Sequence, residues 1–444
     1  MKAKKILETK RAIEKAFLVG ISITGSNEYI SIDDSLKELA LLSETAGLKI
    51  VGFESQILSK PNPATFIGSG KVNEIKYLAE SVKADIVIFD TELLPRNFRE
   101  LEKSFGENIR VIDRTTLILD IFGQHAQTRE GKLQVELAQY EYFLPRLTKA
   151  WSHLARQAGG GGGRTGNSGG VGLRGPGETQ LEVDRRRIKT KISHLKEDLD
   201  KVRRHRQLYR KNRKLSQLPI VALVGYTNAG KSTILNSLTN ADVFTANKLF
   251  ATLDPTTRRL LLPSGNVVLL TDTVGFIQKL PTHLIAAFRA TLEEISEADL
   301  LLHVIDISHP NTIAQWHSVM KTLIDIDAGN IPIIIVLNKI DKTDMYEEIK
   351  NKFPEYKNGI PISAVKMIGV DHLLYNIDHL LFKRYTKITA RIPYKNGKLI
   401  ALFHQFGKVE KVEHGVGSVL ISGSIPGRMI ADFKRYQSPE NIIK

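Results

Sequence analysis

A glycine-rich loop ending in a lysine and a serine is the first set of residues that could do chemistry. The segment Gly225–Ser232 reads G-Y-T-N-A-G-K-S and follows the apolar run P-I-V-A-L-V. It matches G-x-x-x-x-G-K-[ST] between a strand and a helix, where backbone N–H groups surround phosphate oxygens. The Lys231 ammonium would reach the outer phosphates, and the Ser232 hydroxyl would ligate Mg²⁺. The predicted contacts are Gly225, Tyr226, Thr227, Asn228, Ala229, Gly230, Lys231 and Ser232.

A second motif, D-T-V-G, begins at Asp272 after the apolar run V-V-L-L-T. Its carboxylate can hold Mg²⁺ through water, and the Gly275 N–H can sense a γ-phosphate. In the segment L-F-A-T-L-D-P-T-T-R-R before it, a threonine should close on Mg²⁺ and the γ-phosphate. Thr252 is our choice, but spacing alone does not decide against Thr256 or Thr257. Further expected nucleotide contacts are Phe250, Ala251, Leu253, Asp254, Thr273 and Val274.

Two later motifs specify the base. N-K-I-D at 338–341 follows I-P-I-I-I-V-L, and S-A-V at 363–365 follows G-I-P-I. The Asp341 carboxylate can accept hydrogen bonds from guanine N1 and N2, a donor pair that adenine lacks. The Ala364 N–H would meet guanine O6. Four motifs at the carboxyl ends of strands predict a GTP site that includes Asn338, Lys339, Ile340, Asp341, Ser363, Ala364 and Val365.

The predicted catalytic residues are Lys231, Thr252 and Gly275. Ras-like switches place a water-orienting glutamine directly after D-x-x-G, and here that position is Phe276. An apolar ring cannot orient the attacking water, so intrinsic hydrolysis should be slow unless another group helps. Asn228 resembles the asparagine of potassium-activated GTPases, which makes K⁺ a candidate cofactor beside Mg²⁺. The alternative for Asn228 is ordinary hydrogen bonding within the loop.

The elements that position these motifs alternate between strand and helix. Residues 215–384 contain five buried strand patterns separated by helical segments, typical of a doubly wound, mainly parallel P-loop GTPase domain. Residues 1–125 show the same alternation and predict a separate α/β domain. Residues 385–444 read strand, helix, two strands and helix, which predicts a small α+β domain. The fold class is therefore multidomain α/β.

Residues 126–214 differ because their apolar residues follow a heptad spacing. The first series begins at Leu133, and the rhythm resumes at Leu181. Two heptad helices that flank a loop predict an antiparallel hairpin, with arms of about 25–30 residues. Pro145 should kink the first arm.

The glycine-rich loop at 158–179 should form the tip of this hairpin. Within it, residues 170–175 fit G-x-G-x-x-G, but no strand precedes them and no helix follows, so we reject a dinucleotide site. About 20 flexible residues span more than an antiparallel turn needs, which favours a finger over a tether. Its two arginines, Arg164 and Arg174, are predicted RNA contacts.

The chain carries a net charge of +15, which favours a polyanionic partner. Residues 182–214 contain 14 Lys/Arg against five Asp/Glu. This excess of one sign predicts an RNA-binding stripe, although a solvated helix face is the alternative. The predicted contacts are Arg203, Arg204, Arg206 and Arg210.

Composition excludes several classes of protein. There is no cysteine, so disulfides and thiolate metal sites are absent. The charged start is unlike a signal peptide, and no apolar run approaches the ~20 residues of a membrane span. We expect a soluble, cytoplasmic protein, with partial membrane association as an addition.

The phosphate loop G-Y-T-N-A-G-K-S-T, the segment L-F-A-T-L-D-P-T-T-R, D-T-V-G-F and the stretch G-G-V-G-L-R-G-P-G-E-T-Q-L-E-V-D-R-R resemble the HflX family of ribosome-associated GTPases. The resemblance also covers N-P-A-T-F-I-G-S-G-K-V-N-E-I from Asn62. It implies binding to the large (50S) ribosomal subunit and 23S rRNA, and dissociation of stalled or stress-inactivated 70S ribosomes. It also implies that some members use ATP through the N-terminal domain and unwind RNA. We expect a monomer.

Other readings stay open. Gly68–Lys71 (G-S-G-K) precedes a predicted helix and could hold a phosphate, although simple helix capping is the alternative. An ATP-dependent RNA helicase or rRNA-remodelling factor acting through this domain is the alternative function. A non-catalytic RNA-binding scaffold is a third hypothesis, against which the intact nucleotide motifs argue.

Overall fold

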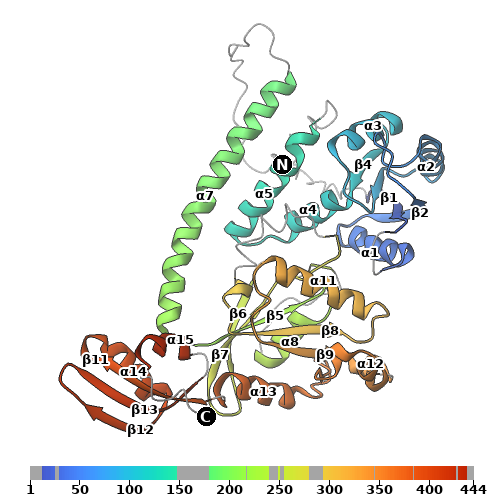
Figure 1. The fold of residues 1–444 in the computed structure, drawn as a ribbon. Coiled ribbons are helices and arrows are strands. Elements are labelled where there is room, and N and C mark those ends of the chain that lie inside the picture. Colours follow the sequence, from blue (N-terminus) through green and yellow to red (C-terminus); the bar gives the residue numbers. More distant parts are fainter. Residues whose placement is uncertain are drawn as a thin grey trace, which may run out of the picture.

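The computed structural model describes residues 13–25, 30–147, 180–216, 218–239, 249–250, 255–279, 294–344, 346–383, 385–426 and 429–437. It confirms the expected fold class, because two α/β units, a helical hairpin and a small α+β unit follow one another along the chain (Figure 1). The boundaries expected between these units, near residues 125, 214 and 384, stay predictions.

The N-terminal unit is a four-stranded parallel sheet in the order β2-β1-β3-β4. Apolar residues alternate between its faces, so helices can cover both sides. Leu18 and Ile88 pack with α1 on one face, whereas Phe17 and Phe89 pack with α2 and α3 on the other. The elements are β1 (Lys15–Ile23), α1 (Ile32–Thr45), β2 (Lys49–Leu58), α2 (Ser69–Ser81), β3 (Ile86–Phe89), α3 (Pro95–Phe105) and β4 (Arg110–Asp113).

Two local signals set the bounds of α1. The Ser31 hydroxyl accepts a hydrogen bond from the Asp34 N–H at 3.1 Å and caps the start of the helix. Gly47 follows the end with a φ of +84°, a left-handed conformation that glycine adopts without strain. This capped helix carries Ser35 and Glu38 towards the carboxyl edge of the sheet.

The hairpin packs α5 (Arg129–Phe143) against α7 (Gln180–Ser216), and α4 (Arg114–His125) precedes it. Leu137 of α5 lies in one apolar cluster with Leu195 and Leu199 of α7, as the heptad spacing predicts. Ion pairs flank the seam, with Glu136–Lys191 at 3.2 Å and Glu141–Lys196 at 2.8 Å. Among the described helices α7 is the longest, and in Figure 1 it runs beside α5.

The first arm differs from expectation near Pro145. Instead of a kinked helix, α5 ends at Phe143 and a 3₁₀ turn, η1 (Leu144–Arg146), follows. Proline lacks an N–H and clashes with the preceding turn, which accounts for the end of α5 just before it. Leu147 then leaves the helical conformation with a ψ of 120°. Leu147 packs with Ile188 in the core of the N-terminal unit. The predicted tip, residues 158–179, lies outside the described residues.

The second α/β unit contains a six-stranded sheet in the order β10-β9-β8-β5-β7-β6. All of its strands are parallel except β6, which pairs antiparallel with β7. Its elements are β5 (Ile220–Gly225), α8 (Lys231–Thr239), β6 (Thr256–Leu261), β7 (Val267–Asp272), β8 (Leu300–Asp306), α11 (Thr312–Asp325), β9 (Ile333–Asn338), η2 (Ile340–Lys342), α12 (Tyr346–Lys352), η3 (Pro354–Tyr356), β10 (Ile360–Pro361), α13 (Val370–Asp378) and η4 (His379–Lys383).

The C-terminal unit is a three-stranded antiparallel sheet in the order β11-β13-β12. Phe403 and Phe433 meet edge to face at 5.4 Å in its core. The elements are β11 (Tyr385–Pro393), η5 (Tyr394–Asn396), α14 (Gly397–Phe406), β12 (Lys408–His414), β13 (Ser418–Pro426), α15 (Ile430–Phe433) and η7 (Lys434–Tyr436).

Within the described ranges, no helix has the length and apolar character needed to cross a membrane. Partial membrane association stays a prediction.

Candidate functional site

The phosphate loop needs glycine at two places because neighbouring atoms leave no room for a side chain. Gly225 has a φ of +153°, and a Cβ there would lie 2.3 Å from the carbonyl oxygen of Val304. Gly230 has a φ of +99°, and its Cβ would lie 2.3 Å from Nδ2 of Asn338. The glycine spacing therefore reflects close contact between β5, β8 and β9 at the carboxyl edge of the sheet.

Lys231 begins α8 and is held inside this loop. Its ammonium donates hydrogen bonds to the carbonyl oxygens of Tyr226 at 2.9 Å and Gly225 at 3.2 Å. Burial lowers the Lys231 pKa to about 8, and the nearby Lys339 acts in the same direction. Placing this cation in a low-dielectric loop makes an anionic phosphate its natural counter-ion.

Ser232 and Asp272 lie together at the predicted Mg²⁺ position. The Ser232 hydroxyl donates to Oδ2 of Asp272 at 2.6 Å, and Asp272 is fully buried at the end of β7. The next residue is anchored because the Thr273 hydroxyl donates to the Leu223 carbonyl oxygen at 2.6 Å. A hydroxyl and a carboxylate are oxygen ligands of the kind Mg²⁺ prefers, so these residues fit the ion.

The structure describes two of the three threonines that could ligate Mg²⁺ from the segment before D-T-V-G. Thr252 lies outside the described residues, as do Ala251, Leu253 and Asp254. Thr257 lies in β6, where its hydroxyl pairs with that of Thr271 at 2.9 Å. Thr256 lies opposite Asp272 in the β6–β7 ladder. The choice of Thr252 therefore stays a prediction.

The D-T-V-G segment continues alongside the phosphate loop. The Phe276 N–H donates to the Gly225 carbonyl oxygen at 3.0 Å, and the Thr227 N–H donates to the Phe276 carbonyl oxygen at 2.8 Å. A Cβ on Gly275 would lie 2.9 Å from Cα of Thr227 and 3.1 Å from Nζ of Lys231. The Phe276 ring is buried in the core, so this position contributes packing and no water-orienting group.

On the base side, Asn338 joins two of the motifs. Its amide Nδ2 donates to the Ala229 carbonyl oxygen at 2.9 Å, and its Oδ1 accepts from the Ala364 N–H at 3.2 Å. Lys339 has a φ of +68°, and its ammonium donates to the Asn228 carbonyl oxygen at 2.7 Å. These contacts place the phosphate loop, N-K-I-D and S-A-V around one edge of the sheet.

Asp341 is partly exposed at this edge, beside Ile340 in η2. A hydrogen bond from the Ser363 side chain lowers the Asp341 pKa below the ordinary value, so the carboxylate stays an acceptor at neutral pH. Ser363 itself is buried, whereas the Val365 side chain is largely exposed. An ionised carboxylate beside the Ala364 N–H is the arrangement expected for reading guanine.

Two residues that sequence motifs did not assign also belong to this region. Asp306 ends β8 and accepts from the Lys339 ammonium at 2.6 Å, so it orients the lysine of N-K-I-D. Its position at the carboxyl end of a buried strand was the available signal. His303 lies in the same strand, and burial, together with Lys231, lowers its pKa to about 3.

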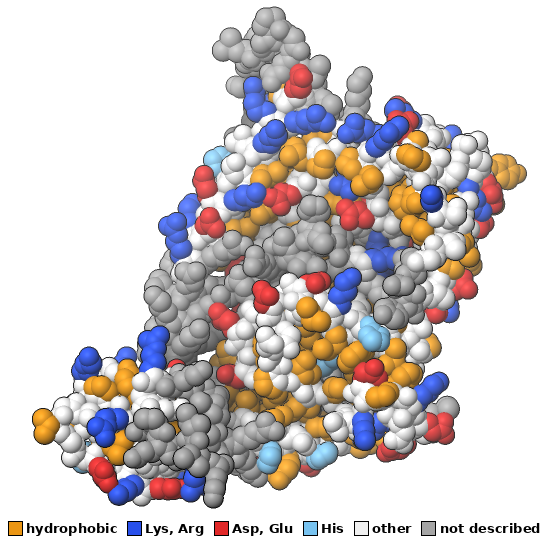
Figure 2. All heavy atoms as spheres, viewed as in Figure 1, with side chains coloured by type: hydrophobic (Ala, Val, Ile, Leu, Met, Phe, Trp, Pro, Cys, Tyr) orange, Lys and Arg blue, Asp and Glu red, His pale blue; other side chains and the backbone are white. Residues whose placement is uncertain are grey.

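The predicted RNA contacts are only partly described. Arg164 and Arg174 lie outside the described residues, and Arg203, Arg206 and Arg210 are described in α7 by backbone only. Arg204 is exposed. Figure 2 shows Lys and Arg side chains interspersed with Asp and Glu at the upper left, where Figure 1 places α7. By sequence, the five Asp and Glu residues of 182–214 all precede Lys201, so the net positive charge of α7 lies mainly after that residue.

The G-S-G-K segment of the N-terminal unit differs from the phosphate loop. Gly68 caps α2 with extended backbone, and a Cβ there would meet nothing within 4 Å. The Lys71 ammonium lies 2.8 Å from Glu74 and 3.3 Å from Glu54. Because two carboxylates already surround this lysine, the contacts favour the capping interpretation over a phosphate site.

Three family models match successive parts of the chain. They are "GTP-binding GTPase N-terminal" at residues 33–123, "GTP-binding GTPase Middle Region" at 125–213 and "50S ribosome-binding GTPase" at 220–339. Among solved structures, the chain is similar to a GTP-binding protein from Sulfolobus solfataricus in complex with GDP. That similarity has 25% identity, a TM-score of 0.40, and coverage of 82% of this chain and 97% of the other.

Curated relatives cover nearly the whole chain. The GTPase HflX of Caldanaerobacter subterraneus subsp. tengcongensis is 45% identical over 402 residues, which are 90% of this chain and 89% of the relative. The GTPase HflX of Escherichia coli K12 is 41% identical over 425 residues, which are 95% of each chain. With its nucleotide motifs gathered at one sheet edge, the chain is a GTPase, and it belongs to the HflX family.

Proposed function

We propose that this GTPase binds the large ribosomal subunit and, in its GTP-bound form, dissociates stalled or stress-inactivated 70S ribosomes into subunits. The observation that carries the proposal is a nucleotide site joined to an extended cationic hairpin. α7 ends at Ser216, and β5, which leads into the phosphate loop, begins at Ile220. The match to a family described as a 50S ribosome-binding GTPase supports the choice of partner.

We assign the nucleotide contacts as the motifs predict. Lys231 and the N–H groups of the phosphate loop bind the phosphates, and the Gly275 N–H contacts the γ-phosphate. Asp341 and the Ala364 N–H read guanine. Mg²⁺, which GTPases generally use, would be held by Ser232 and Thr252 and, through water, by Asp272; it would neutralise charge on the phosphates.

Potassium is a further cofactor in this proposal. Asn228 has a φ of +59°, in the turn of the phosphate loop between Thr227 and Ala229. Because the buried Phe276 supplies no polar group for catalysis, a cation bound near Asn228 would complement the developing charge. GTP hydrolysis should be faster in KCl than in NaCl at equal ionic strength. Equal rates would remove potassium from the proposal.

The RNA contacts are proposed for the C-terminal part of α7 and the hairpin tip. Arg203, Arg204, Arg206 and Arg210 would bind phosphates of 23S rRNA, whereas Arg164 and Arg174 would contact RNA at the tip. Such contacts make binding salt-dependent, because each neutralised phosphate releases counter-ions. Deleting residues 160–175 should spare GTP binding and impair ribosome dissociation; unchanged dissociation would reduce the loop to a tether.

Sedimentation of 70S ribosomes on sucrose gradients tests the whole proposal. Free subunits should increase with the monomeric protein plus GTP or a non-hydrolysable GTP analogue, and less with GDP. Lys231→Ala should abolish the nucleotide dependence; if it dissociates ribosomes normally, the protein is an RNA-binding scaffold. Failure to cosediment with 50S subunits at low and moderate salt would contradict ribosome binding.

ATP use by the N-terminal domain is the alternative, and the same gradients with ATP analogues address it. The ion pairs of Lys71 with Glu54 and Glu74 weigh against a phosphate site in G-S-G-K. ATP binding that persists in Lys231→Ala would nevertheless locate a second nucleotide site.

A further inference from the structure

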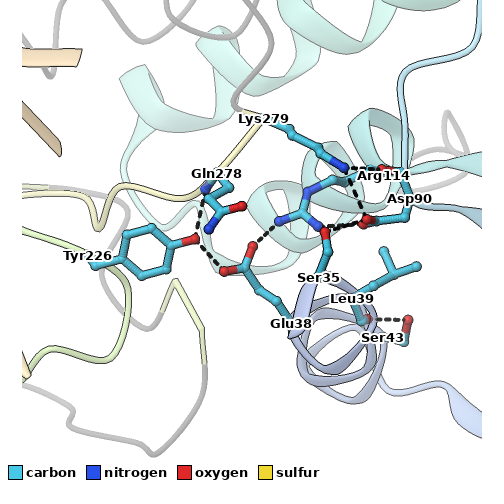
Figure 3. Close-up of polar contacts among 9 residues, drawn as sticks. All are labelled: Ser35, Glu38, Leu39, Ser43, Asp90, Arg114, Tyr226, Gln278 and Lys279. Atoms are coloured by element: carbon cyan, nitrogen blue, oxygen red, sulfur yellow. Dashed lines mark hydrogen bonds and ion pairs between the residues drawn. The ribbon is translucent and has the colours of Figure 1, made fainter. Parts of the chain in front are cut away.

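Tyr226 belongs to the phosphate loop by sequence, but its side chain extends towards the N-terminal domain (Figure 3). Its hydroxyl donates a hydrogen bond to Oε2 of Glu38 in α1, 188 residues away in the chain. The same hydroxyl oxygen accepts from the Gln278 N–H at 2.9 Å. Tyr226 is buried, whereas Glu38 and Gln278 are partly buried.

Glu38 also belongs to a cluster of charged side chains in the N-terminal domain. Arg114, at the start of α4, pairs with Glu38 and, through Nη1, with Oδ1 of Asp90 at 2.6 Å. Asp90 also accepts a hydrogen bond from the Ser35 hydroxyl at 2.5 Å. The cluster is completed from the GTPase domain by Lys279, whose ammonium lies 3.3 Å from Oδ2 of Asp90 (Figure 3).

The charges of this cluster balance only when the two domains are together. Glu38 and Asp90 carry two negative charges, Arg114 carries one positive charge, and Lys279 supplies the second. Burial opposes the charged form of Arg114, but the two carboxylates outweigh burial and raise its pKa. Burial and the Glu38 charge raise the pKa of Tyr226, so its hydroxyl stays protonated as a donor. Withdrawing Lys279 would leave an uncompensated buried negative charge, which is unfavourable.

Both segments held by the N-terminal domain contact the phosphate site. The Tyr226 carbonyl oxygen is one of the two acceptors of the Lys231 ammonium. Tyr226 also pairs through its backbone with Phe276, directly after D-T-V-G. Lys279 lies three residues beyond Phe276 and has a φ of +51°, a conformation that a non-glycine residue keeps only when its surroundings enforce it.

We propose that Tyr226 is a positioning residue through which the N-terminal domain holds the phosphate loop. Glu38 fixes the Tyr226 hydroxyl and Asp90 fixes Lys279, so docking of the domain steadies the loop and the segment after D-T-V-G together. Release of bound nucleotide is then coupled to undocking of the N-terminal domain. This inference concerns the GTPase site itself and does not depend on the proposed action on ribosomes.

The first test compares two tyrosines with the same chemistry in the full-length protein. Tyr226→Phe removes one buried hydroxyl at the domain interface. Tyr142→Phe removes another, which donates from α5 of the hairpin to the buried Asp113 at the end of β4. Release of a fluorescent GDP should become about fivefold to tenfold faster in Tyr226→Phe, at the lower end of typical coupling factors, and stay unchanged in Tyr142→Phe.

Thermal unfolding distinguishes positioning from loss of stability. A positioning role predicts faster release in Tyr226→Phe with a Tm no lower than that of Tyr142→Phe. The same release rate in both variants would overturn the proposal, because the interface hydroxyl would then have no special effect on the nucleotide.

A second variant separates the domain interface from the loop itself. Lys279→Met keeps the length of the side chain but removes the charge that Asp90 receives. It should also accelerate GDP release, and the effects of Tyr226→Phe and Lys279→Met should be less than additive because both act through docking. Hydrogen exchange of the α1 amides, Ile32–Thr45, should become faster in both variants. If Lys279→Met changes neither release nor exchange, the effect of Tyr226 is confined to the loop and the interdomain coupling is wrong.

Discussion

The two α/β units place carboxylates at the same edge of a parallel sheet but use them differently. In the GTPase domain, Asp272 meets the Ser232 hydroxyl beside the phosphate loop, where Gly225 and Gly230 leave no room for a side chain. In the N-terminal domain, Asp113 accepts from the Leu93 N–H, the Thr116 N–H and the Tyr142 hydroxyl. Ligands commonly bind at this edge. A carboxylate whose acceptor sites are filled by the protein instead becomes part of the structure.

Asp90 extends the comparison, because the other domain supplies one of its partners. Arg114 and Ser35 come from its own unit, and Lys279 comes from the GTPase domain. The edge that would form a ligand crevice in an isolated α/β domain here serves as a domain interface. The difference between the two units lies in what saturates the carboxylates, not in the topology of the sheets.

The two lysines that follow glycine in these units should give the largest contrast. Lys231→Ala should lower kcat/KM for GTP by about 10²–10³-fold, the effect of losing one charged contact to a transition state. Lys71→Ala should leave GTP hydrolysis unchanged, because Glu54 and Glu74 already engage that lysine. Steady-state hydrolysis by both variants provides the measurement. A comparable loss in Lys71→Ala would mean that the N-terminal unit also contributes to catalysis.

Replacing the partly exposed carboxylate of the GTPase edge should change base specificity. Asp341→Asn should weaken GTP binding by about a hundredfold, because an amide cannot accept both guanine donors. Xanthosine triphosphate, which has a carbonyl at C2, should bind the variant better than the parent protein. Competition between the two nucleotides measures this exchange. Retained preference for GTP would show that Asp341 does not read the base.

The two domains also differ in the space around one glycine each, and a smaller effect is expected from filling that space. A Cβ on Gly275 would lie 2.9 Å from Cα of Thr227, whereas one on Gly68 would meet nothing within 4 Å. Overpacking of this kind costs about 1–3 kcal/mol, so Gly275→Ala should slow GTP hydrolysis by about tenfold to a hundredfold. Gly68→Ala should hydrolyse GTP normally. Equal activity of the two variants would remove the close approach of Gly275 as a functional requirement.

The last prediction concerns a titratable residue inside one sheet. His303 lies in β8, whereas β3 of the N-terminal sheet is entirely apolar. Because burial and Lys231 lower the His303 pKa to about 3, the unfolded state binds a proton between pH 6.5 and 3 that the folded state does not. The contribution of His303 to the free energy of unfolding is therefore fully present above pH 6.5. It declines as the pH falls below that value, by up to about 1.4 kcal/mol per pH unit.

Hydrogen exchange of the β8 amides between pH 6.5 and 4.5, corrected for intrinsic rates, measures this slope. His303→Leu should reduce it by about one proton, while exchange in β3 should keep the same pH dependence in both proteins. An unaltered slope in β8 would mean that His303 does not titrate as its burial indicates.

Local patterns predicted much of this molecule. Buried runs such as I-V-A-L-V-G and I-I-I-V-L-N identified strands, and the confirmed parallel sheet follows from helices between them. The heptad spacing placed Leu137 against Leu195 and Leu199, because a period of 3.5 residues defines one face of a helix. The nucleotide motifs are short and contiguous, so their places along the chain were readable without a structure.

Contacts between distant residues were not predictable in this way. Tyr226 is identified from the sequence only as a phosphate-loop residue, because no local pattern indicates its contact with Glu38, 188 residues away. Arg114 and Asp90 were unremarked polar residues in an α/β pattern, and their burial depends on how two domains meet. Pro145 was recognised as a disruption, but whether a proline kinks or ends a helix depends on packing, here that of Leu147 against Ile188. The choice of Thr252 and the RNA contacts stay predictions.

The length of α7 has a mechanical consequence. Its 37 residues correspond to about 55 Å, and only three residues separate Ser216 from the first residue of β5. A helix that long acts as a lever, because a tilt of about 5° at one end displaces the other end by about 5 Å. Sub-ångström movements around a phosphate can in this way become movements as large as a nucleobase at the distant end of α7. In the opposite direction, a force applied to that end can be transmitted to the loop that holds the nucleotide.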